Sequence, residues 1–497
     1  MIQNDQSDQS EIERLEQIFN KQKLAFSKNP YPDCKQRIEL MRKIPDMLMK
    51  NRNKIIECLH LDYGYHSPQT AEIHEILSSI NRFRYNSSQL KKWMQPMQRQ
   101  GNPIMMGSSK AYVKYQPKGV IGNIVSWNFP FDVSMGPTLD ALAAGNRVII
   151  KPSDLTPACG ELLHEMISQT FDQDQVAVVN GGLQLAQHFS TLKWDHLLYT
   201  GSTEIGKQIM KNAAVNLVPV TLELGGKCPV IVSDDQVNQQ TAKVIVGVKM
   251  IKRGQLCVTA DYCLVSESKL NEFVNLLKTE LEKIFSNENG KRDGCSIINT
   301  KNVQRIYAMV NEARLENAQI IQIGADVPNE NRNLPFYIII NPARHLQVAK
   351  QEAFGPVLAV YTYKQIDDAI AFVNEGEKPL GIYIFSKDKE MIDSICTYTT
   401  SGGVAINTVG MQASLPSLTF GGAGSSGMGR HHGEEGFREF SIPRGYFELG
   451  KGGNFSEMMP PYSDGTNKII NIAYADVGTQ VKFALKAIVQ NLKAYLS

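Results

Sequence analysis

The sequence lacks a charge excess of either sign and any long apolar run. Its 52 lysine and arginine residues are nearly balanced by 50 aspartate and glutamate residues, so the net charge is only +2. This balance provides no broad electrostatic reason to bind nucleic acid. No stretch approaches about 18 uninterrupted apolar residues, the length that a membrane-crossing helix needs. We therefore predict no nucleic-acid partner and no integral membrane association.

The sequence also has few cysteines, and its N-terminus has no apolar core of a secretory signal. The eight cysteines show neither the paired spacing of a metal site nor a dense disulfide framework. They stand at positions 34, 58, 159, 228, 257, 263, 295 and 396. Scattered thiols without a secretion signal are typical of the reducing cytosol, so we predict a cytoplasmic protein.

What is present is a long chain with regular alternation of segments. Its 497 residues are too many for one simple core, so two or three domains are expected. Apolar residues recur at helical spacing through residues 11–98. From residue 118 short apolar runs alternate with helical segments, as in GVIGNIVSWN (119–128) and HLLYTGS (196–202). This βαβα rhythm predicts an α/β fold with a mostly parallel, two-faced sheet.

A second set of strands begins near residue 228 and includes AVYTY (359–363) and IYIFS (382–386). Two glycines in LELGGK (222–227) interrupt the pattern, which places the junction of two α/β domains there. Residues 451–468 have the composition of a loop. The segment 481–496 is predicted as an amphipathic helix docked on its own or a partner subunit, with membrane-surface contact through its lysines as the alternative.

Two residues are candidates for covalent and acid–base chemistry. Cys257 in RGQLCVTADY would react only as a thiolate, which needs a positive or polar environment. Lys252 and Arg253 bring charge close in sequence, and whether they face the thiol stays open. Glu223 in TLELGG would become a base near neutral pH if burial raised its pKa. The alternatives are a structural cysteine and a solvated or capping carboxylate.

Two further motifs are ambiguous from the residues alone. GSTEIG (201–206) lies between a predicted strand and a predicted helix, where backbone N–H groups can face an anion. It lacks the full G-x-G-x-x-G spacing, so an ordinary tight turn is the alternative. His431 and His432 are adjacent on a predicted extended loop. Their side chains should point apart, and no third ligand is evident, so we predict no metal site.

The combination of motifs is more specific than any one of them. WNFP, KPSD, GSTEIG, LELGGK, GQLC, EAFGPVL and FGGAGSSGMGRHHGEEG occur in this order. The chain thereby resembles the aldehyde dehydrogenase superfamily from about residue 20 to about residue 445. Glu223 and Cys257 are 34 positions apart (257 − 223), as the family pattern requires. PPY (460–462) and SIIN (296–299) most resemble the coniferyl aldehyde dehydrogenase branch, which lies near the short, dimeric class.

The resemblance implies a covalent mechanism. Cys257 matches the nucleophile that attacks the aldehyde carbon to form a thiohemiacetal. Asn128 matches the side-chain donor of the oxyanion hole, and the N–H of Cys257 is the second donor. Hydride transfer to NAD or NADP leaves a thioester, and Glu223 matches the base that activates water to hydrolyse it. Relatives that transfer the acyl group to coenzyme A generally lack this glutamate, so the expected product is a free carboxylic acid.

The resemblance also implies binding residues. Lys151 matches the residue that binds the adenosine ribose, Glu352 the ligand of the nicotinamide ribose, and Phe354 an aromatic beside that ring, with core packing as its alternative. The predicted cofactor set is Trp127, Lys151, Ser153, Asp154, Gly201, Ser202, Gly206, Leu224, Glu352 and Phe354. The predicted substrate set is Phe129, Leu256, Val258 and Phe420, whereas Phe131 has core packing as an equal alternative. An apolar, aromatic-lined tunnel favours an aromatic or medium-chain aliphatic aldehyde.

The sequence departs from the family pattern at several positions. Ser126 stands where proline is commoner, and Cys228 stands where serine is common. Lys252 and Arg253 replace the usual small and amide residues before GQLC. Asp154 stands where glutamate is commoner, and its shorter reach leaves the preference between NAD and NADP open.

The implied architecture has three parts and a tail. A Rossmann-like cofactor domain is expected over 1–106 and 117–225, and an α/β catalytic domain over 226–436. The strands 107–116 and 437–450 would form a small oligomerisation excursion, and 451–497 the tail. A homodimer is expected, with a tetramer as the alternative.

Overall fold

A computed structural model describes residues 2–101, 106–286, 294–325, 332–451, 455–482, 485, 486 and 489. The chain divides into two compact units. The larger comprises residues 1–90 and 117–440, and the smaller comprises residues 91–116 and 441–497. Among the described residues, no helix has the length and apolar character that crossing a membrane requires.

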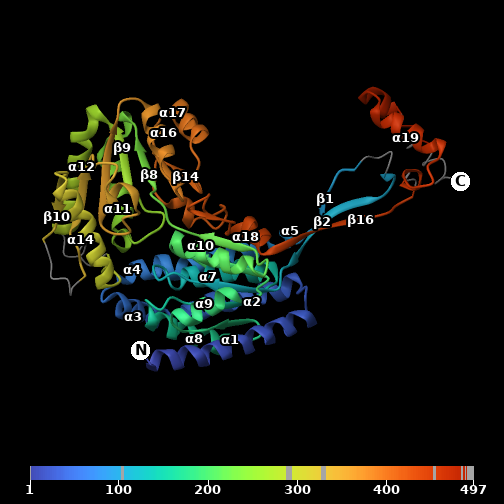
Figure 1. Ribbon diagram of the computed structural model, residues 1–497, viewed down its shortest axis with the longest axis horizontal. Helices are drawn as coiled ribbons and strands as arrows, with labels where there is room; N and C mark the ends of the chain where they lie inside the picture. Colours follow the sequence, from blue (N-terminus) through green and yellow to red (C-terminus); the bar gives the residue numbers. More distant parts are fainter. Residues whose placement is uncertain are drawn as a thin grey trace. The chain divides into compact units, whose positions relative to one another are not determined.

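The predicted helical character of the N-terminal region is confirmed (Figure 1). The helices there are α1 (Ile2–Lys28), α2 (Cys34–Lys50), α3 (Arg52–Tyr63), α4 (Pro68–Ala71), η1 (Glu72–Leu77) and α5 (Ser78–Trp93). α1 lies against α9 (Leu183–Thr191), where the Asp8 carboxylate accepts the Gly182 N–H at 2.7 Å. Leu15 and Ile18 of α1 are buried in the core of the first sheet.

The first sheet has six strands, and its strand order changes direction at β3. The order is β15 (Gly427–Met428), β7 (Val220–Glu223), β6 (His196–Thr200), β3 (Val120–Ile124), β4 (Arg147–Lys151) and β5 (Val176–Val178). All are parallel except β15. The chain leaves β3 toward β4 and later returns to place β6 on its other side. Ligands bind at such a switch point, beyond the carboxyl ends of the strands.

Helices flank the strands of this first sheet. They are α7 (Asp132–Ala144), α8 (Pro157–Thr170), α9 and α10 (Thr203–Ala214). Every residue of β3 is buried, as expected for a parallel strand covered on both faces.

The second sheet has seven strands. The order is β10 (Gln319–Ile323), β11 (Phe336–Ile340), β12 (Val357–Tyr363), β9 (Tyr262–Ser266), β8 (Pro229–Val232), β13 (Gly381–Phe385) and β14 (Gly403–Ile406). Only β10 is antiparallel to its neighbour. Its main helices are α11 (Gln239–Met250), α12 (Leu270–Ser286), α14 (Thr300–Leu315), α16 (Ile366–Glu375) and α17 (Lys389–Tyr398). The two predicted sets of strands therefore form two separate sheets.

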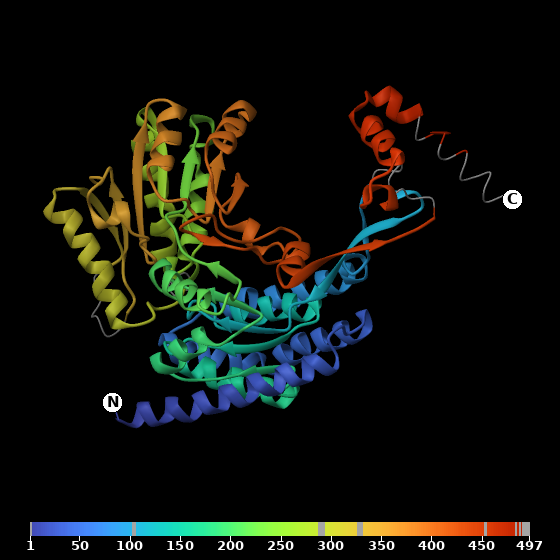
Figure 2. The same cartoon turned by 45° about the vertical axis from the view of Figure 1, so that its right-hand side comes forward.

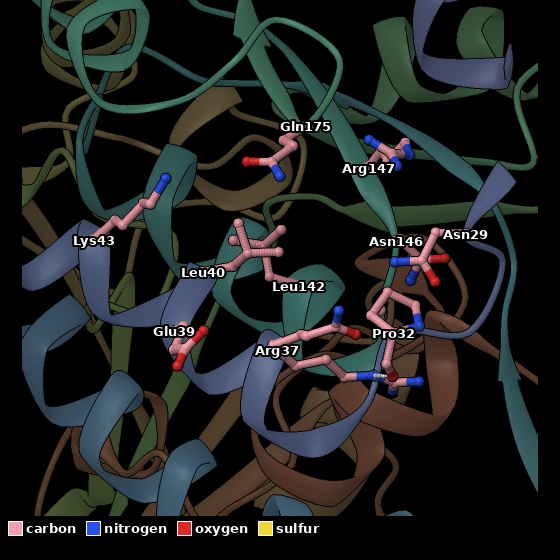
Figure 3. A pocket seen from close by; sticks show the side chains of 12 residues that line it. Asn29, Pro32, Arg37, Glu39, Leu40, Lys43, Leu142, Asn146, Arg147 and Gln175 are labelled. Atoms are coloured by element: carbon pink, nitrogen blue, oxygen red, sulfur yellow. Dashed lines mark hydrogen bonds between the residues drawn. The ribbon is translucent and has the colours of Figure 1, made fainter. Parts of the chain in front are cut away.

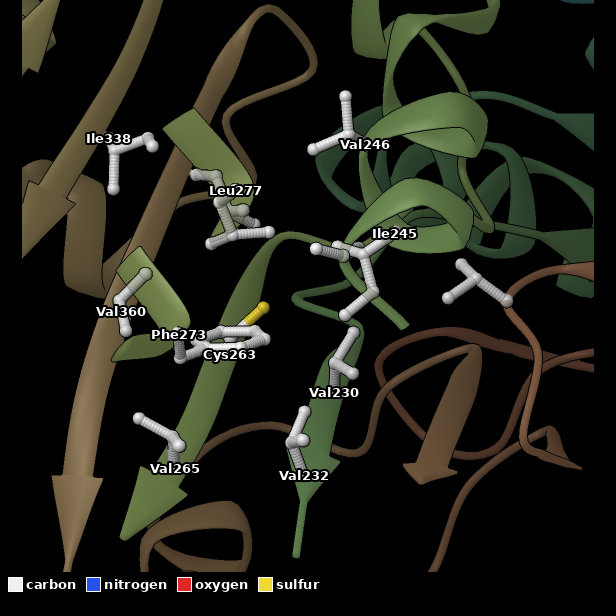
Figure 4. Packing of buried hydrophobic residues seen from close by; sticks show 14 of the residues in the cluster. Val230, Val232, Ile245, Val246, Cys263, Val265, Phe273, Leu277, Ile338 and Val360 are labelled. Atoms are coloured by element: carbon white, nitrogen blue, oxygen red, sulfur yellow. The ribbon is translucent and has the colours of Figure 1, made fainter. Parts of the chain in front are cut away.

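One core of the second sheet lies between its strands and the helices α11 and α12 (Figure 4). Val230 of β8, Ile245 of α11 and Leu277 of α12 are fully buried there. Cys263 of β9 is part of the same cluster, so its thiol is a packing group.

The smaller unit contains a three-stranded sheet of β1 (Met97–Gln98), β2 (Lys110–Pro117) and β16 (Ser441–Glu448). The rings of Tyr112 and Tyr446 stack across it at 5.1 Å. β16 begins later than the predicted segment 437–450, because residues Gly433–Glu439 form the helix α18.

The prediction of a loop through residues 451–468 is wrong at its end. The helix α19 begins at Asp464, since Ser463 and Thr466 form a capping box that satisfies the first backbone N–H groups. The predicted amphipathic helix 481–496 lies largely outside the described residues.

The packing of α1 leads to a stability prediction. Replacing the fully buried Leu15 by alanine should lower the free energy of unfolding by about 2–5 kcal/mol, because it removes apolar contacts and leaves a cavity. The matched control is Leu24→Ala on the same helix, where the side chain is 59% exposed. Urea unfolding followed by circular dichroism measures both. Equal losses for the two variants would show that α1 is not docked as described.

Candidate active site

Polar side chains gather at the carboxyl edge of the first sheet. Asn128 follows β3, Lys151 ends β4, Ser202 follows β6 and Glu223 ends β7. Because these strands are parallel and adjacent, their carboxyl ends meet at one edge. The structure thus places predicted catalytic and cofactor residues from four sequence segments along one edge.

Three further predicted residues lie at the amino edge of the second sheet. Cys257 comes shortly before β9, and Glu352 and Phe354 come shortly before β12. Two contacts join the edges of the two sheets. The Asn128 amide Nδ2 donates to the Gln255 carbonyl at 3.2 Å, and the rings of Trp127 and Phe354 meet edge to face at 5.4 Å. The site is therefore built where the carboxyl edge of one sheet faces the amino edge of the other.

Cys257 is half-buried, and its surroundings oppose ionisation. Burial raises the pKa of its thiol well above the ordinary range, and the nearby Glu352, Cys228 and Glu223 raise it further. The Cys228 thiol donates to the Cys257 carbonyl at 3.4 Å. The residue in the position of the family's serine thus contacts the segment 251–261 between α11 and β9, here called the nucleophile loop. These surroundings favour the thiol over the thiolate, so a base nearby would help to make Cys257 nucleophilic.

Glu223 has the surroundings of a poised base. Its side chain is 4% exposed, and neither carboxyl oxygen has a hydrogen-bond partner within the part of the chain described. Burial raises its pKa well above the usual range, an effect that Arg430 only partly opposes. The closest basic group is His431 Nε2, 3.7 Å from Oε1, and burial keeps this imidazole neutral by lowering its pKa. Glu223 therefore retains its proton to an unusually high pH.

His431 and His432 do not point apart, contrary to the expectation from their extended loop. Their rings meet edge to face at 4.6 Å, and the Phe420 ring stacks on His432 at 5.2 Å. The ring of Phe420 packs both imidazoles together. No group of three histidine, cysteine, aspartate or glutamate side chains with metal-binding geometry occurs among the residues described.

The adenosine side of the predicted cofactor site follows β4 and β6. Lys151 is buried, its Nζ donates to the Pro152 carbonyl at 3.0 Å, and burial lowers its pKa while Asp154 opposes that shift. The Ser153 hydroxyl accepts the Leu155 N–H at 3.2 Å. Asp154 itself is exposed.

The GSTEIG turn packs tightly against the strand that ends in Glu223. The N–H of Gly201 donates to the Glu223 carbonyl at 2.9 Å. A Cβ at Gly206 would lie 2.6 Å from a methyl of Leu224, so only glycine lets α10 approach this strand so closely. Ser202 is exposed at the N-cap position of α10, where backbone N–H groups point outward. The turn and helix start fit a nucleotide diphosphate.

The nicotinamide side is shaped by the loop before β12. A Cβ at Gly225 would collide with the Glu352 carboxylate, so this glycine leaves room for that side chain. Burial and the neighbouring Asp261 raise the pKa of Glu352 to about 8. Phe354 has a left-handed backbone (φ 42°), an unusual conformation that turns its ring against Trp127. Gly225 therefore allows the Glu352 carboxyl to lie against the backbone that follows β7.

Two of the predicted substrate residues, Leu256 and Val258, flank Cys257 in sequence, and Phe420 packs against the same apolar cluster as Cys257. Phe129 lies instead against the Lys252 ammonium. Leu256 is buried, Val258 is half-buried, and Phe129 and Phe420 are half-buried. Phe131, by contrast, is fully buried, so core packing is the correct alternative for it.

Lys252 and Arg253 do not face the thiol. The Lys252 ammonium pairs with the Glu75 carboxylate at 2.5 Å and donates to the Asn128 carbonyl. The Arg253 guanidinium donates to the carbonyls of Cys295 at 3.0 Å and Leu334 at 2.9 Å. Sequence reasoning missed Glu75, because it lies in a region that the sequence marked only as helical. A fully buried carboxylate is visible only in the tertiary structure.

A surface cavity of about 290 Å³ lies elsewhere, at the amino end of β4 (Figure 3). Arg37, Lys43, Arg147 and Gln175 are among its lining side chains. It contains none of the predicted site residues, and Arg147 and Lys151 stand at opposite ends of the same strand.

The parallel first sheet changes its strand direction at β3, as in dinucleotide-binding folds, and the edges of the two sheets bring a cysteine loop and a buried carboxyl to one region. Such a fold is typical of cofactor-dependent dehydrogenases. The model of the aldehyde dehydrogenase family matches residues 5–444, so the chain belongs to that family. It is an oxidoreductase that oxidises an aldehyde with NAD or NADP.

Two proteins named as coniferyl aldehyde dehydrogenases and one solved structure are similar to most of this chain. The probable coniferyl aldehyde dehydrogenase of Pseudomonas aeruginosa is 38% identical, over 94% of this chain and 97% of that protein. The coniferyl aldehyde dehydrogenase of a Pseudomonas species is 33% identical, over 93% and 96%. The solved substrate-bound state of Staphylococcus aureus AldH superposes with a TM-score of 0.86 at 32% identity, covering 93% of this chain and 99% of that one.

The environment of Glu223 leads to a prediction about stability. Folded Glu223 keeps its proton at pH values where the unfolded chain has released it, so the folded state binds more protons and stability falls as pH rises. Glu223→Gln removes this penalty. The variant should melt higher than the wild type at pH 8, by roughly 2 °C or more, and the difference should shrink toward pH 5. Melting curves across this range measure it, and a difference that does not depend on pH would contradict it.

Proposed function

We propose that this protein oxidises an aromatic or medium-chain aliphatic aldehyde, such as coniferyl aldehyde, to the free carboxylic acid, with Cys257 as nucleophile and Glu223 as base. The observation that carries the proposal is the buried Glu223 carboxyl, which has no hydrogen-bond partner among the described residues. It ends β7 at the sheet edge that also holds Asn128, whose amide contacts the segment before Cys257 at Gln255. A carboxyl left unpaired in a buried site is costly, and a catalytic role explains its retention.

The first step requires loss of the Cys257 proton. Glu223, once ionised, accepts this proton directly or through one water, and the thiolate sulfur then attacks the aldehyde carbon. Negative charge develops on the aldehyde oxygen. The Asn128 amide, which donates to Gln255 in the resting state, and the N–H of Cys257 are the donors for this oxyanion. Removing one such donor typically costs about 3–4 kcal/mol of transition-state stabilisation.

Bound NAD or NADP would supply the hydride acceptor that oxidation of the thiohemiacetal requires. Lys151 would hold the adenosine ribose, and the backbone after β6 with Ser202 would hold the diphosphate. Glu352 and Phe354 would hold the nicotinamide ribose and ring. Ser153, Asp154 and Leu224 complete the walls of this site, and the preference between the two cofactors is decided near Asp154.

Glu223 also selects the second half of the reaction. The thioester on Cys257 has a nearby buried carboxyl that can remove a proton from water, which directs the acyl group to hydrolysis. Acyl transfer to coenzyme A or phosphate does not use such a base. The expected product is therefore the acid.

The relatives and the apolar residues beside the nucleophile support the choice of substrate. Leu256, Val258, Phe129 and Phe420 offer an apolar and aromatic surface, which suits an aryl or alkyl aldehyde. We further propose a cytoplasmic homodimer, with a tetramer as the alternative. The three-stranded sheet of the smaller unit has exposed residues along β16 and would pair with a second copy.

The catalytic roles are tested by two variants. Cys257→Ala should abolish NADH formation, because no covalent adduct forms. Glu223→Gln should lower steady turnover by at least about 10²-fold and allow no more than a single burst of NADH before the acyl-enzyme accumulates. Stopped-flow absorbance and intact-protein mass measure the burst and the adduct. Steady turnover like that of the wild type in either variant would rule out the assignment.

The substrate class is tested by initial rates with aromatic and aliphatic aldehydes, each with NAD and with NADP. Coniferyl aldehyde should give one of the highest kcat/KM values, and short polar aldehydes should be poorer by about 10-fold or more, since each buried methylene contributes to binding. Phe420→Ala should reduce this discrimination. Product analysis with and without coenzyme A distinguishes hydrolysis from acyl transfer, and a requirement for coenzyme A would contradict the proposal.

A further inference from the structure

Two of the positions at which this chain departs from the family pattern contact the same residue. The Ser126 hydroxyl donates to the Asn128 side-chain oxygen at 2.7 Å, and the Lys252 ammonium donates to the Asn128 carbonyl. We propose that Lys252, paired with Glu75, and Ser126 are positioning residues that hold Asn128 toward the nucleophile loop. The inference rests on the proposed function, in which Asn128 is an oxyanion donor.

The Lys252–Glu75 pair is fully buried, and it joins three segments of the chain. One Glu75 oxygen binds the Lys252 ammonium at 2.5 Å. The other accepts the N–H groups of Phe131 at 3.0 Å and Asp132 at 3.1 Å, at the start of α7. The carboxylate is thus saturated with donors, and the pair links η1, the nucleophile loop and the segment that follows Asn128.

Neighbouring aromatic residues complete the frame around Lys252. The Tyr63 hydroxyl lies 2.9 Å from the carbonyl oxygen of Trp127 and 3.2 Å from that of Asn128, and the two carbonyls share its one hydrogen. The Lys252 ammonium lies 4.0 Å from the centre of the Phe129 ring and 5.3 Å from that of Tyr63. Such cation–π contacts are strong when both groups are out of water. The Asn128 backbone is therefore fixed by two donors from two different elements.

The backbone of the nucleophile loop is shaped to make this contact. Lys252 (φ 45°) and Arg253 (φ 50°) both adopt the left-handed region, which residues with side chains rarely occupy. The turn sends their side chains in opposite directions, to Glu75 and to the carbonyls of Cys295 and Leu334. It also presents the Gln255 carbonyl to the Asn128 amide. Such strained backbone conformations persist where many surrounding contacts hold them in place, and they are often found at catalytic sites.

Each of the two departures has a separate effect on Asn128. Lys252 fixes where the backbone lies, and Ser126 fixes how the amide is turned, because a donor on the oxygen leaves the NH₂ group to face the nucleophile loop. A proline at position 126 has no hydroxyl to do this. The hydroxyl and the ammonium together set both the place and the direction of the oxyanion donor.

The experiment is a double-mutant cycle on the full-length enzyme with its better cofactor and aldehyde, read as the rate of the first NADH turnover. The single-step proteins are the wild type, the charge-pair variant Glu75→Gln/Lys252→Met, Ser126→Ala and Asn128→Ala. The charge-pair variant and Ser126→Ala are each also combined with Asn128→Ala. Removing both charges of the pair avoids an uncompensated buried ion. Lys278→Met, at a 47% exposed side chain, is the control for loss of a lysine, and melting temperatures report folding.

We expect Asn128→Ala to slow the first turnover by about 10²-fold. The charge-pair variant should slow it by roughly 10-fold, and Ser126→Ala by roughly 3-fold, in kcat more than in KM. In the Asn128→Ala background each added change should cost less than about 2-fold, because its target is gone. Losses that multiply in that background would overturn the positioning role while leaving the proposed function intact.

The remaining outcomes are also decisive. A normal first turnover in Asn128→Ala would overturn the oxyanion role and the inference together. If the charge-pair variant does not fold, the Ser126→Ala arm carries the test, since it removes one half-buried hydroxyl. Multiplicative loss in that arm overturns the inference, and loss only in the presence of Asn128 supports it.

Discussion

The hydrogen bond from the Asn128 amide to the Gln255 carbonyl joins loops that belong to different sheets. Asn128 follows a strand of the first sheet, and Gln255 precedes a strand of the second. Chemistry that needs a nucleophile, a base and an oxyanion donor requires these loops to keep one relative position. The remaining features of the site serve this constraint: the parallel strands align the loop ends, and buried polar contacts hold the loops themselves.

Several features near these loops lower the stability of the folded chain. Glu223 lies in the interior without a hydrogen-bond partner among the described residues, and Lys252 and Arg253 hold left-handed backbone conformations. Each feature would be removed by selection for stability alone. These residues lie at the edges of the two sheets, where the proposed site is. The apolar clusters lie on the sheet faces, where Val230, Leu277 and their neighbours pack together.

Local patterns predicted the elements well and their ends less well. Apolar runs such as HLLYTGS became β6, because a parallel strand covered on both faces must be apolar throughout. The start of α19 was missed, since a capping box in a stretch rich in polar residues and proline is a weak signal. His431 and His432 were expected to diverge, yet the ring of Phe420 packs them together. The contact between Phe420 and the two imidazoles is tertiary packing, which the hydrophobic periodicity of the sequence cannot predict.

The sequence by itself determined the class of chemistry, because the order and spacing of short motifs around Asn128, Glu223 and Cys257 are specific to one family. It also marked Ser126 and Lys252 as unusual. Only the tertiary structure decided what these residues contact. The Lys252 ammonium, five positions before Cys257 in sequence (257 − 252), turns to Glu75 rather than to the thiol. Burial and contact between segments set the direction of a side chain, and neither is a property of local sequence.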